Sequence, residues 1–130
     1  MKKKILIVDD DPDIIFSIRK ILENMVRDEY NIISAENGKQ CLELLQNNEN
    51  PDIILLDIMM PEINGWVVYD MVKNNPSWKD IPIVFLTARK DKLAAGAGER
   101  LGDDYITKPF ESEELVKRID NVLKKHVILN

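Results

Sequence analysis

Short apolar runs that alternate with longer segments place the strongest constraint on how this chain folds. Residues 5–8, 53–56 and 83–86 are continuously apolar and rich in β-branched side chains. Unbroken apolar runs of this length are typical of strands covered on both faces of a sheet. Two weaker runs, at residues 32–33 and 105–106, complete a series of five.

The segments between these runs have the period of amphipathic helices. Apolar residues recur at spacings of three and four in residues 14–25, 41–45, 67–72 and 115–123. Asp11 followed by Pro12 predicts a helix start, because Asp caps the first turn and Pro fits the first helical position. Asn-Gly pairs at residues 37–38 and 64–65 mark turns that lead into helices.

Five strands alternating with five helices predict an α/β fold with a parallel sheet and helices on both faces. Right-handed crossovers are then nearly obligatory. Five strands suit the flavodoxin-like doubly wound (βα)5 order 2-1-3-4-5. Because no linker or repeat divides the 130 residues, we expect a single domain over residues 1–130.

Composition excludes several functions. The net charge of −5 argues against broad contact with nucleic acid or anionic membranes. The single cysteine permits no internal disulfide, which fits a reducing compartment. No apolar run approaches the ~18 residues that span a bilayer, and the start of the chain lacks the pattern of a secretory signal. We therefore expect a cytoplasmic protein.

Chemically distinctive side chains follow four of the predicted strands. They are Asp9, Asp10 and Asp11 after the first, Asp57 at the end of the third, Thr87 and Ala88 after the fourth, and Lys108 before Pro109 after the fifth. The carboxyl ends of parallel strands share one edge of the sheet, and ligands bind there in doubly wound folds. We therefore expect these side chains to converge.

Asp9, Asp10 and Asp57 would bring three carboxylates to one edge, where they would repel one another. At about 5 Å and an effective dielectric near 20, each pair costs roughly 3 kcal/mol. Mg²⁺ relieves this repulsion, because it prefers oxygen ligands and often binds carboxylates together with a phosphate oxygen. One carboxylate could then attack a phosphoryl group, with Lys108 and Thr87 stabilising the transferred oxygens.

The segments that carry these residues resemble the receiver domain of two-component response regulators. They are residues 7–11 (IVDDD), 54–61 (ILLDIMMP), 64–65 (NG), 85–88 (FLTA) and 103–110 (DDYITKPF). The resemblance extends over roughly residues 4–125, with the motifs in the family's order and near its spacing.

The resemblance implies an acceptor and a metal site. Asp57 matches the phosphoacceptor, and Asp10 matches the direct ligand of Mg²⁺, for which Mn²⁺ is a substitute. Asp9 matches the partner that often acts through water, and the backbone carbonyl of Met59 matches a further metal ligand.

The resemblance also implies a switch. Thr87, Ala88 and Lys108 match phosphate-binding and switch positions, and Tyr105 matches an aromatic residue whose rotamer follows the hydroxyl of Thr87. In this family the bond before the residue that matches Pro109 is usually cis. Phosphorylation would reshape the face of the fourth helix, fifth strand and fifth helix, which a protein target would bind.

The partners implied are a sensor histidine kinase or phosphotransfer protein as donor and a protein as target, without direct contact to nucleic acid or membrane. We expect a non-enzymatic, stand-alone receiver, as in chemotaxis, that is a monomer or a phosphorylation-dependent dimer.

The sequence departs from the family pattern at two places. The distance from Thr87 to Lys108 is about one residue short, and residues 93–102 contain glycines where a helix is expected. We hypothesise a short, irregular or mobile fourth helix, since each helical Gly costs about 1 kcal/mol. Met59 and Arg89 occupy positions that influence hydrolysis in this family, and Met59 cannot orient water strongly. We therefore hypothesise slow self-dephosphorylation.

Three alternatives stay open. An Mg²⁺-dependent phosphohydrolase with an aspartyl nucleophile would want a second Asp where Met59 stands. A flavin or nucleotide binder would want a glycine- or hydroxyl-rich loop in place of Asp9–Asp11. A receiver-like interaction module without phosphorylation would not need the complete set of polar residues.

Overall fold

From β1 to β4 the described strands and helices alternate as the apolar runs predict, and β5 and α5 follow. The computed structural model describes residues 2–25, 29–88 and 104–129, and for residues 126–129 the backbone alone. The elements in chain order are β1 (Lys3–Val8), α1 (Pro12–Met25), β2 (Tyr30–Ala35), α2 (Gly38–Gln46), β3 (Ile53–Asp57), α3 (Gly65–Lys73), β4 (Ile83–Ala88), β5 (Asp104–Lys108) and α5 (Ser112–Leu129). The hypothesis of an irregular fourth helix concerns a segment outside the described residues.

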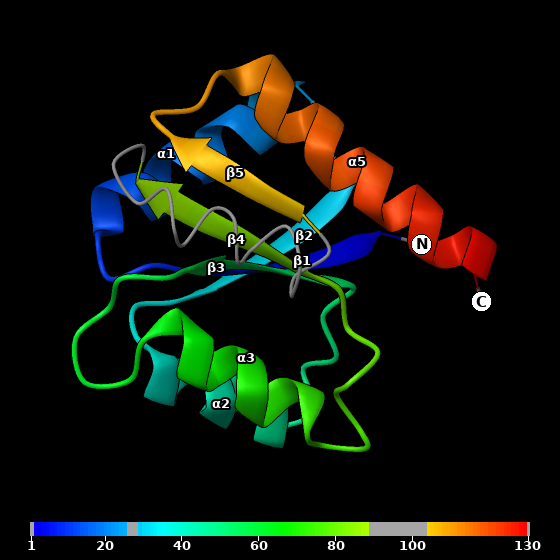
Figure 1. The fold of residues 1–130 in the computed structure, drawn as a ribbon. Helices are drawn as coiled ribbons and strands as arrows, with labels where there is room; N and C mark the ends of the chain where they lie inside the picture. The colour runs from blue at the N-terminus through cyan, green and yellow to red at the C-terminus, as the bar shows by residue number, and fades with distance from the viewer. Residues whose placement is uncertain (1, 26–28, 89–103, 130) are drawn as a thin grey trace.

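All five strands are parallel and lie in the order β2-β1-β3-β4-β5 (Figure 1). This confirms the predicted flavodoxin-like order. The pairing register aligns the carboxyl ends of the strands, because Val8 pairs with Leu56 and Ala88 pairs with Lys108. The residues that follow these ends therefore meet at one edge of the sheet.

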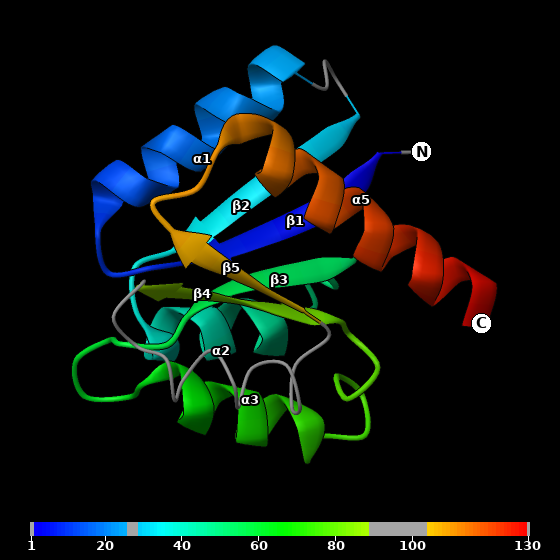
Figure 2. The same cartoon turned by 45° about the horizontal axis from the view of Figure 1, so that its top comes forward.

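Helices cover both faces of the sheet. Helices α1 and α5 lie on one face, and α2 and α3 lie on the other (Figures 1 and 2). Successive residues of β1 point to opposite faces, so Ile5 and Ile7 join one apolar core and Leu6 and Val8 join the other. All four are fully buried, which explains the unbroken apolar run.

The predicted helix starts are confirmed. The Asp11 carboxylate accepts a hydrogen bond from the Asp13 backbone N–H at 2.9 Å, at the start of α1. Asn37 and Asn64 cap α2 and α3, and their side chains accept hydrogen bonds from backbone N–H groups at 2.8 and 3.1 Å. Among the described helices, none combines the length and apolar character needed to cross a bilayer.

Candidate functional site

The site lies at the carboxyl edge of the sheet. Asp9 follows the last residue of β1, and Asp57 and Lys108 are themselves the last residues of β3 and β5. These strands are not all neighbours, since β4 separates β3 from β5. The long Lys108 side chain must therefore reach across the end of β4 to meet the carboxylates.

Lys108 bridges two buried carboxylates. Its Nζ donates to Asp9 Oδ2 at 2.8 Å and to Asp57 Oδ1 at 3.3 Å. Asp9 is fully buried and Asp57 is 5% exposed. Buried carboxylates are costly without a partner, and this lysine offsets part of the cost for both of them.

A third carboxylate completes an acidic cluster. One carboxylate oxygen from each of Asp9, Asp10 and Asp57 lies within 4.8 Å of the others. Asp10 is exposed, whereas the other two are buried. Asp9 Oδ1, the carboxylate oxygen that Lys108 does not bind, accepts a hydrogen bond from the Asp11 backbone N–H at 2.9 Å, which fixes the loop after β1.

The pKa values show an unbalanced negative charge. Burial, and then the charge of Asp9, raise the pKa of Asp57 to about 7, although Lys108 opposes this. Burial likewise raises the pKa of Asp9. Burial alone would lower the pKa of Lys108, but its hydrogen bonds and attraction to Asp9 and Asp57 outweigh it and raise that pKa. One amine therefore does not neutralise the site, and an added cation would be stabilised there.

The donor set fits a hard divalent cation. Three converging carboxylates offer the oxygen ligands that Mg²⁺ prefers, with the exposed Asp10 leaving one side open. Met59 lies just beyond β3, and its side chain is 66% exposed. The acidic cluster is formed by side chains alone, and the Met59 carbonyl as a ligand stays a prediction.

The remaining predicted residues lie on the neighbouring strands. Thr87 is buried near the end of β4, and its hydroxyl donates to the Ala88 carbonyl at 3.3 Å. The Lys108–Pro109 peptide bond is cis. Tyr105 is half-buried on β5, three residues before Lys108, and pairs with Phe85 in the sheet register. The structure thus brings Asp9, Asp10, Asp57 and Lys108 together. Tyr105 lies apart from them on the edge strand, packed against the core beneath α2 and α3, with the Arg118 guanidinium of α5 over its ring.

Gly65 supports the site in a way that sequence reasoning missed. A Cβ atom at Gly65 would lie 2.4 Å from the Asp57 carbonyl oxygen and 2.8 Å from Ile58 Cα. The Gly65 backbone N–H donates to the Ile58 carbonyl at 2.8 Å. The start of α3 therefore presses directly on the backbone that carries Asp57. The Asn-Gly pair was a signal for a turn, but it did not reveal this contact.

Comparison with known proteins agrees with this geometry. The sequence model of the response regulator receiver domain matches residues 5–120. A CheY-like response regulator receiver domain protein from Methanospirillum hungatei JF-1 superposes with a TM-score of 0.79 and 35% identity, over 97% of this chain and 98% of that one.

Two relatives place the same module in longer proteins. The transcriptional regulatory protein CpxR of Escherichia coli (strain K12) is 40% identical over 123 residues, which are 94% of this chain and 50% of that protein. Histidine kinase P4 of Formosa agariphila is 37% identical over 98% of this chain and 9% of its own length. The chain spans about half the length of the regulators it matches. The family match over most of its length shows that this chain belongs to the response regulator receiver domains of two-component signalling, and so to signalling domains rather than enzymes.

Proposed function

We propose that Asp57 is the phosphoacceptor of this receiver domain, and that residues 1–130 form a single domain around it. The observation that carries the proposal is the contact of Lys108 Nζ with both Asp9 and Asp57, beside the exposed carboxylate of Asp10. A buried carboxylate held by one amine, next to two more carboxylates, suits an acceptor that works with a cation. The fold itself does not require three acidic groups at this position.

The proposed donor is a phosphohistidine of a histidine kinase or phosphotransfer protein. One oxygen of Asp57 attacks phosphorus, the P–N bond to the imidazole breaks, and an O–P bond forms. The imidazole nitrogen leaves with the electron pair of the broken bond and takes up a proton. Lys108 holds the Asp57 carboxylate and lies where it can bind an oxygen of the transferred group. The Thr87 hydroxyl, which donates to the Ala88 carbonyl, is the second donor that we assign to that group.

Mg²⁺, or Mn²⁺ in its place, is the cofactor we assign to Asp9, Asp10 and Asp57. When bound, it offsets the charge of the carboxylates and of the phosphoryl oxygens. The support for this assignment is the donor set and the raised pKa values of Asp9 and Asp57.

The downstream target we propose is a protein rather than nucleic acid or membrane. The net charge of −5 supports this part of the proposal. The relatives include proteins named as a transcriptional regulator and as a histidine kinase, so the output attached to this module differs between them. A cytoplasmic location and a monomer, or a phosphorylation-dependent dimer, stay predictions from the sequence.

Phosphorylation by a small-molecule donor tests the proposal. The protein is incubated with acetyl phosphate and Mg²⁺, and intact mass is recorded. We expect one phosphoryl increment that is stable in acid, labile in base, dependent on Mg²⁺ and absent from Asp57→Asn. Asp70→Asn, which alters an exposed carboxylate on α3, is the matched control and should be labelled like the wild type.

Other outcomes would favour the alternatives. Release of many phosphate equivalents per chain would indicate a phosphohydrolase. No increment under any condition would indicate an interaction module that works without phosphorylation. Labelling of Asp57→Asn to the wild-type level would move the acceptor elsewhere.

A further inference from the structure

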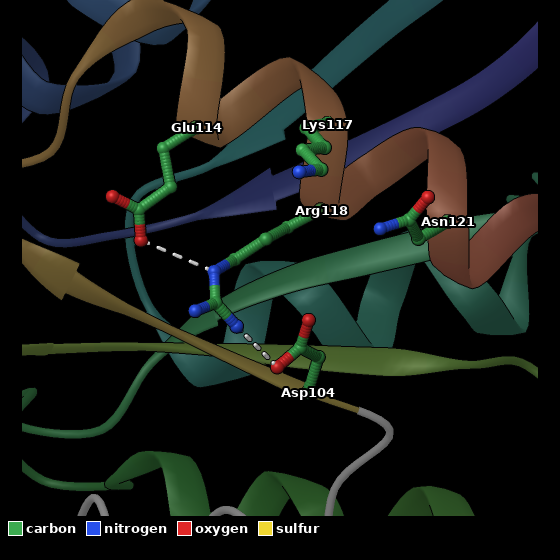
Figure 3. Close-up of a pocket in the computed structure, with 5 residues that line it drawn as sticks. All are labelled: Asp104, Glu114, Lys117, Arg118 and Asn121. Carbon is green, nitrogen blue, oxygen red and sulfur yellow. Dashed lines mark hydrogen bonds and ion pairs between the residues drawn. The ribbon is translucent and has the colours of Figure 1, made fainter.

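The Arg118 side chain on α5 makes two hydrogen bonds, one of them to the first residue of β5 (Figure 3). Its Nη1 donates to Asp104 Oδ1 at 2.7 Å, and its Nε donates to Glu114 Oε1 at 3.1 Å. The Arg118 side chain is only 35% exposed, so these contacts are partly shielded from water. Two charge-assisted bonds to different nitrogens fix the plane of the guanidinium, which a single bond would leave free to rotate.

This guanidinium lies over the ring of Tyr105. Its central carbon is 5.6 Å from the ring centroid, within the range of a cation–π contact. Asp104 Oδ1, which binds Arg118, also accepts from the Tyr105 backbone N–H at 2.8 Å. One carboxylate oxygen therefore fixes both the backbone of Tyr105 and the cation above its ring.

Arg118 and its partners border a surface hollow. Asp104, Glu114, Lys117, Arg118 and Asn121 line a cavity of about 290 Å³ between β5 and α5. None of the contacts drawn in Figure 3 reaches Lys117, although it is a cation one residue before Arg118 on the same helix. The chain thus offers a matched cation that lacks the contact to Tyr105.

We propose that Arg118 is a positioning residue for Tyr105. Anchored by Asp104 and Glu114, Arg118 holds the Tyr105 ring in its observed position against the edge of the core and sets how readily the ring moves out of that position. The part of this inference that concerns phosphorylation rests on the proposed function of Asp57. The contact itself does not.

The strength of the cation–π contact between Arg118 and Tyr105 sets how far its loss shifts the position of the ring. The ring cannot move away from α5 without losing the cation–π contact, because the guanidinium is tied to two carboxylates. A contact of this kind at a partly exposed site shifts a two-state equilibrium by about 2- to 5-fold. Removing the cation should therefore raise the population of the displaced ring by that factor.

Fluorine NMR of the full chain labelled with 3-fluorotyrosine measures the position of the ring. The chain has three tyrosines, and Tyr105→Phe assigns the resonance of Tyr105. Spectra are recorded for the wild type, Arg118→Met, Arg118→Lys and Lys117→Met, each without donor and with acetyl phosphate and Mg²⁺. Intact mass is read on the same samples, and thermal unfolding shows that each variant is folded.

We expect the Tyr105 resonance of unphosphorylated Arg118→Met to move toward its position in the phosphorylated wild type. Arg118→Lys should move less, because it keeps the charge without the planar fork, and Lys117→Met should match the wild type. A Tyr105 resonance that is identical in wild type and Arg118→Met, both folded, would overturn the proposal, as would an equal shift in Lys117→Met. If the mass shows no phosphoryl group in the wild type, the proposed function fails, while the comparison of unphosphorylated proteins still decides the role of Arg118.

Discussion

Asp57 lies in surroundings that favour a neutral or cation-bound carboxyl group. Asp9 is fully buried beside it, and Lys108 divides its positive charge between the two. The energy of this arrangement is unfavourable until another cation arrives, since like charges at this spacing repel by roughly 3 kcal/mol before Lys108 offsets them. Function and stability should therefore oppose each other at this residue.

Asp57→Asn should stabilise the metal-free protein. At pH 7 with EDTA we expect the free energy of unfolding in urea to rise by about 1–2 kcal/mol, because one of two buried like charges is removed. Mg²⁺ should stabilise the wild type by about 1.4 kcal/mol at about ten times its Kd, and Asp57→Asn by less. An Asp57→Asn variant that is less stable than the wild type in EDTA would contradict the electrostatic account, and Asp70→Asn controls for the loss of a surface charge.

Met59→Asn should shorten the lifetime of the phosphorylated protein. The Met59 side chain is 66% exposed just beyond Asp57 and makes no strong hydrogen bond to water. An amide there can orient a water molecule, and one such hydrogen bond corresponds to about a 2- to 10-fold faster hydrolysis. Loss of the phosphoryl mass increment over time measures this rate. Met71→Asn, at an exposed methionine of α3, is the control, and equal lifetimes for all three proteins would disprove the idea.

Adjacent residues in the sequence differ in ways that only coordinates reveal. The order of motifs was enough to place Asp9 and Asp10 together at the sheet edge. The sequence could not tell that Asp9 is buried and bonded to Lys108 whereas Asp10 is exposed, because both are aspartates after the same strand. It also gave no sign that Arg118 contacts Tyr105, because that contact joins an edge strand to a helix.

The close approach of α3 to β3 links the placement of the helix to Asp57, the proposed acceptor. The N-terminal turn of α3 is pressed against the end of β3 at Gly65. The atoms in the way of a side chain are those of the Asp57 and Ile58 backbone, which cannot rotate aside. Gly38, at the start of α2, faces side-chain atoms of Val68 and Ile63 instead.

Gly65→Ala should be far more damaging than Gly38→Ala. We expect a loss of about 2–4 kcal/mol in unfolding free energy for Gly65→Ala, because backbone must shift, and about 1 kcal/mol for Gly38→Ala, where side chains can yield. The displaced Asp57 should also slow labelling by acetyl phosphate. Urea unfolding and intact mass measure the two effects. Similar stability losses in both variants would mean that the close approach to Asp57 is relaxed in solution.

Strands with a long apolar run in the sequence were predictable, and strands with a short apolar run were less so. Strands β1, β3 and β4 are buried on both faces, so their apolar runs identify them. Strand β5 lies at the edge of the sheet, where only Ile106 is buried, so its pattern of two apolar residues is weak. Its assignment relied on the motif around Lys108, because partly exposed positions accept polar side chains at little cost.

Two apolar cores, one on each face of the sheet, hold the whole molecule together. Cys41 on α2 is fully buried in the core beneath α2 and α3. Burial raises the pKa of its thiol to about 12. Because the thiolate is the reactive form, the buried thiol of the folded protein reacts slowly, and fast reaction of Cys41 indicates that the core has opened.

The Cys41 thiol should react with an aromatic disulfide reagent only when the molecule unfolds. At pH 8 the labelling rate should follow urea-induced unfolding measured by circular dichroism. Between pH 9 and about 12 the unfolded chain loses the thiol proton while the folded chain keeps it. Stability should therefore fall as pH rises, by at most about 1.4 kcal/mol per pH unit relative to Cys41→Ala. Rapid labelling of the native protein at pH 8 would show that the core opens locally.

Asp9, Asp57 and Lys108 lie at the ends of three different strands, and the chain separates Lys108 from Asp9 by 99 positions and from Asp57 by 51. An unfolded copy of the chain contains all three residues but does not bring them together, so it has no assembled site. Under the function proposed for Asp57, only the folded fraction of the protein can accept a phosphoryl group, so a change in that fraction changes the amount of phosphorylated protein.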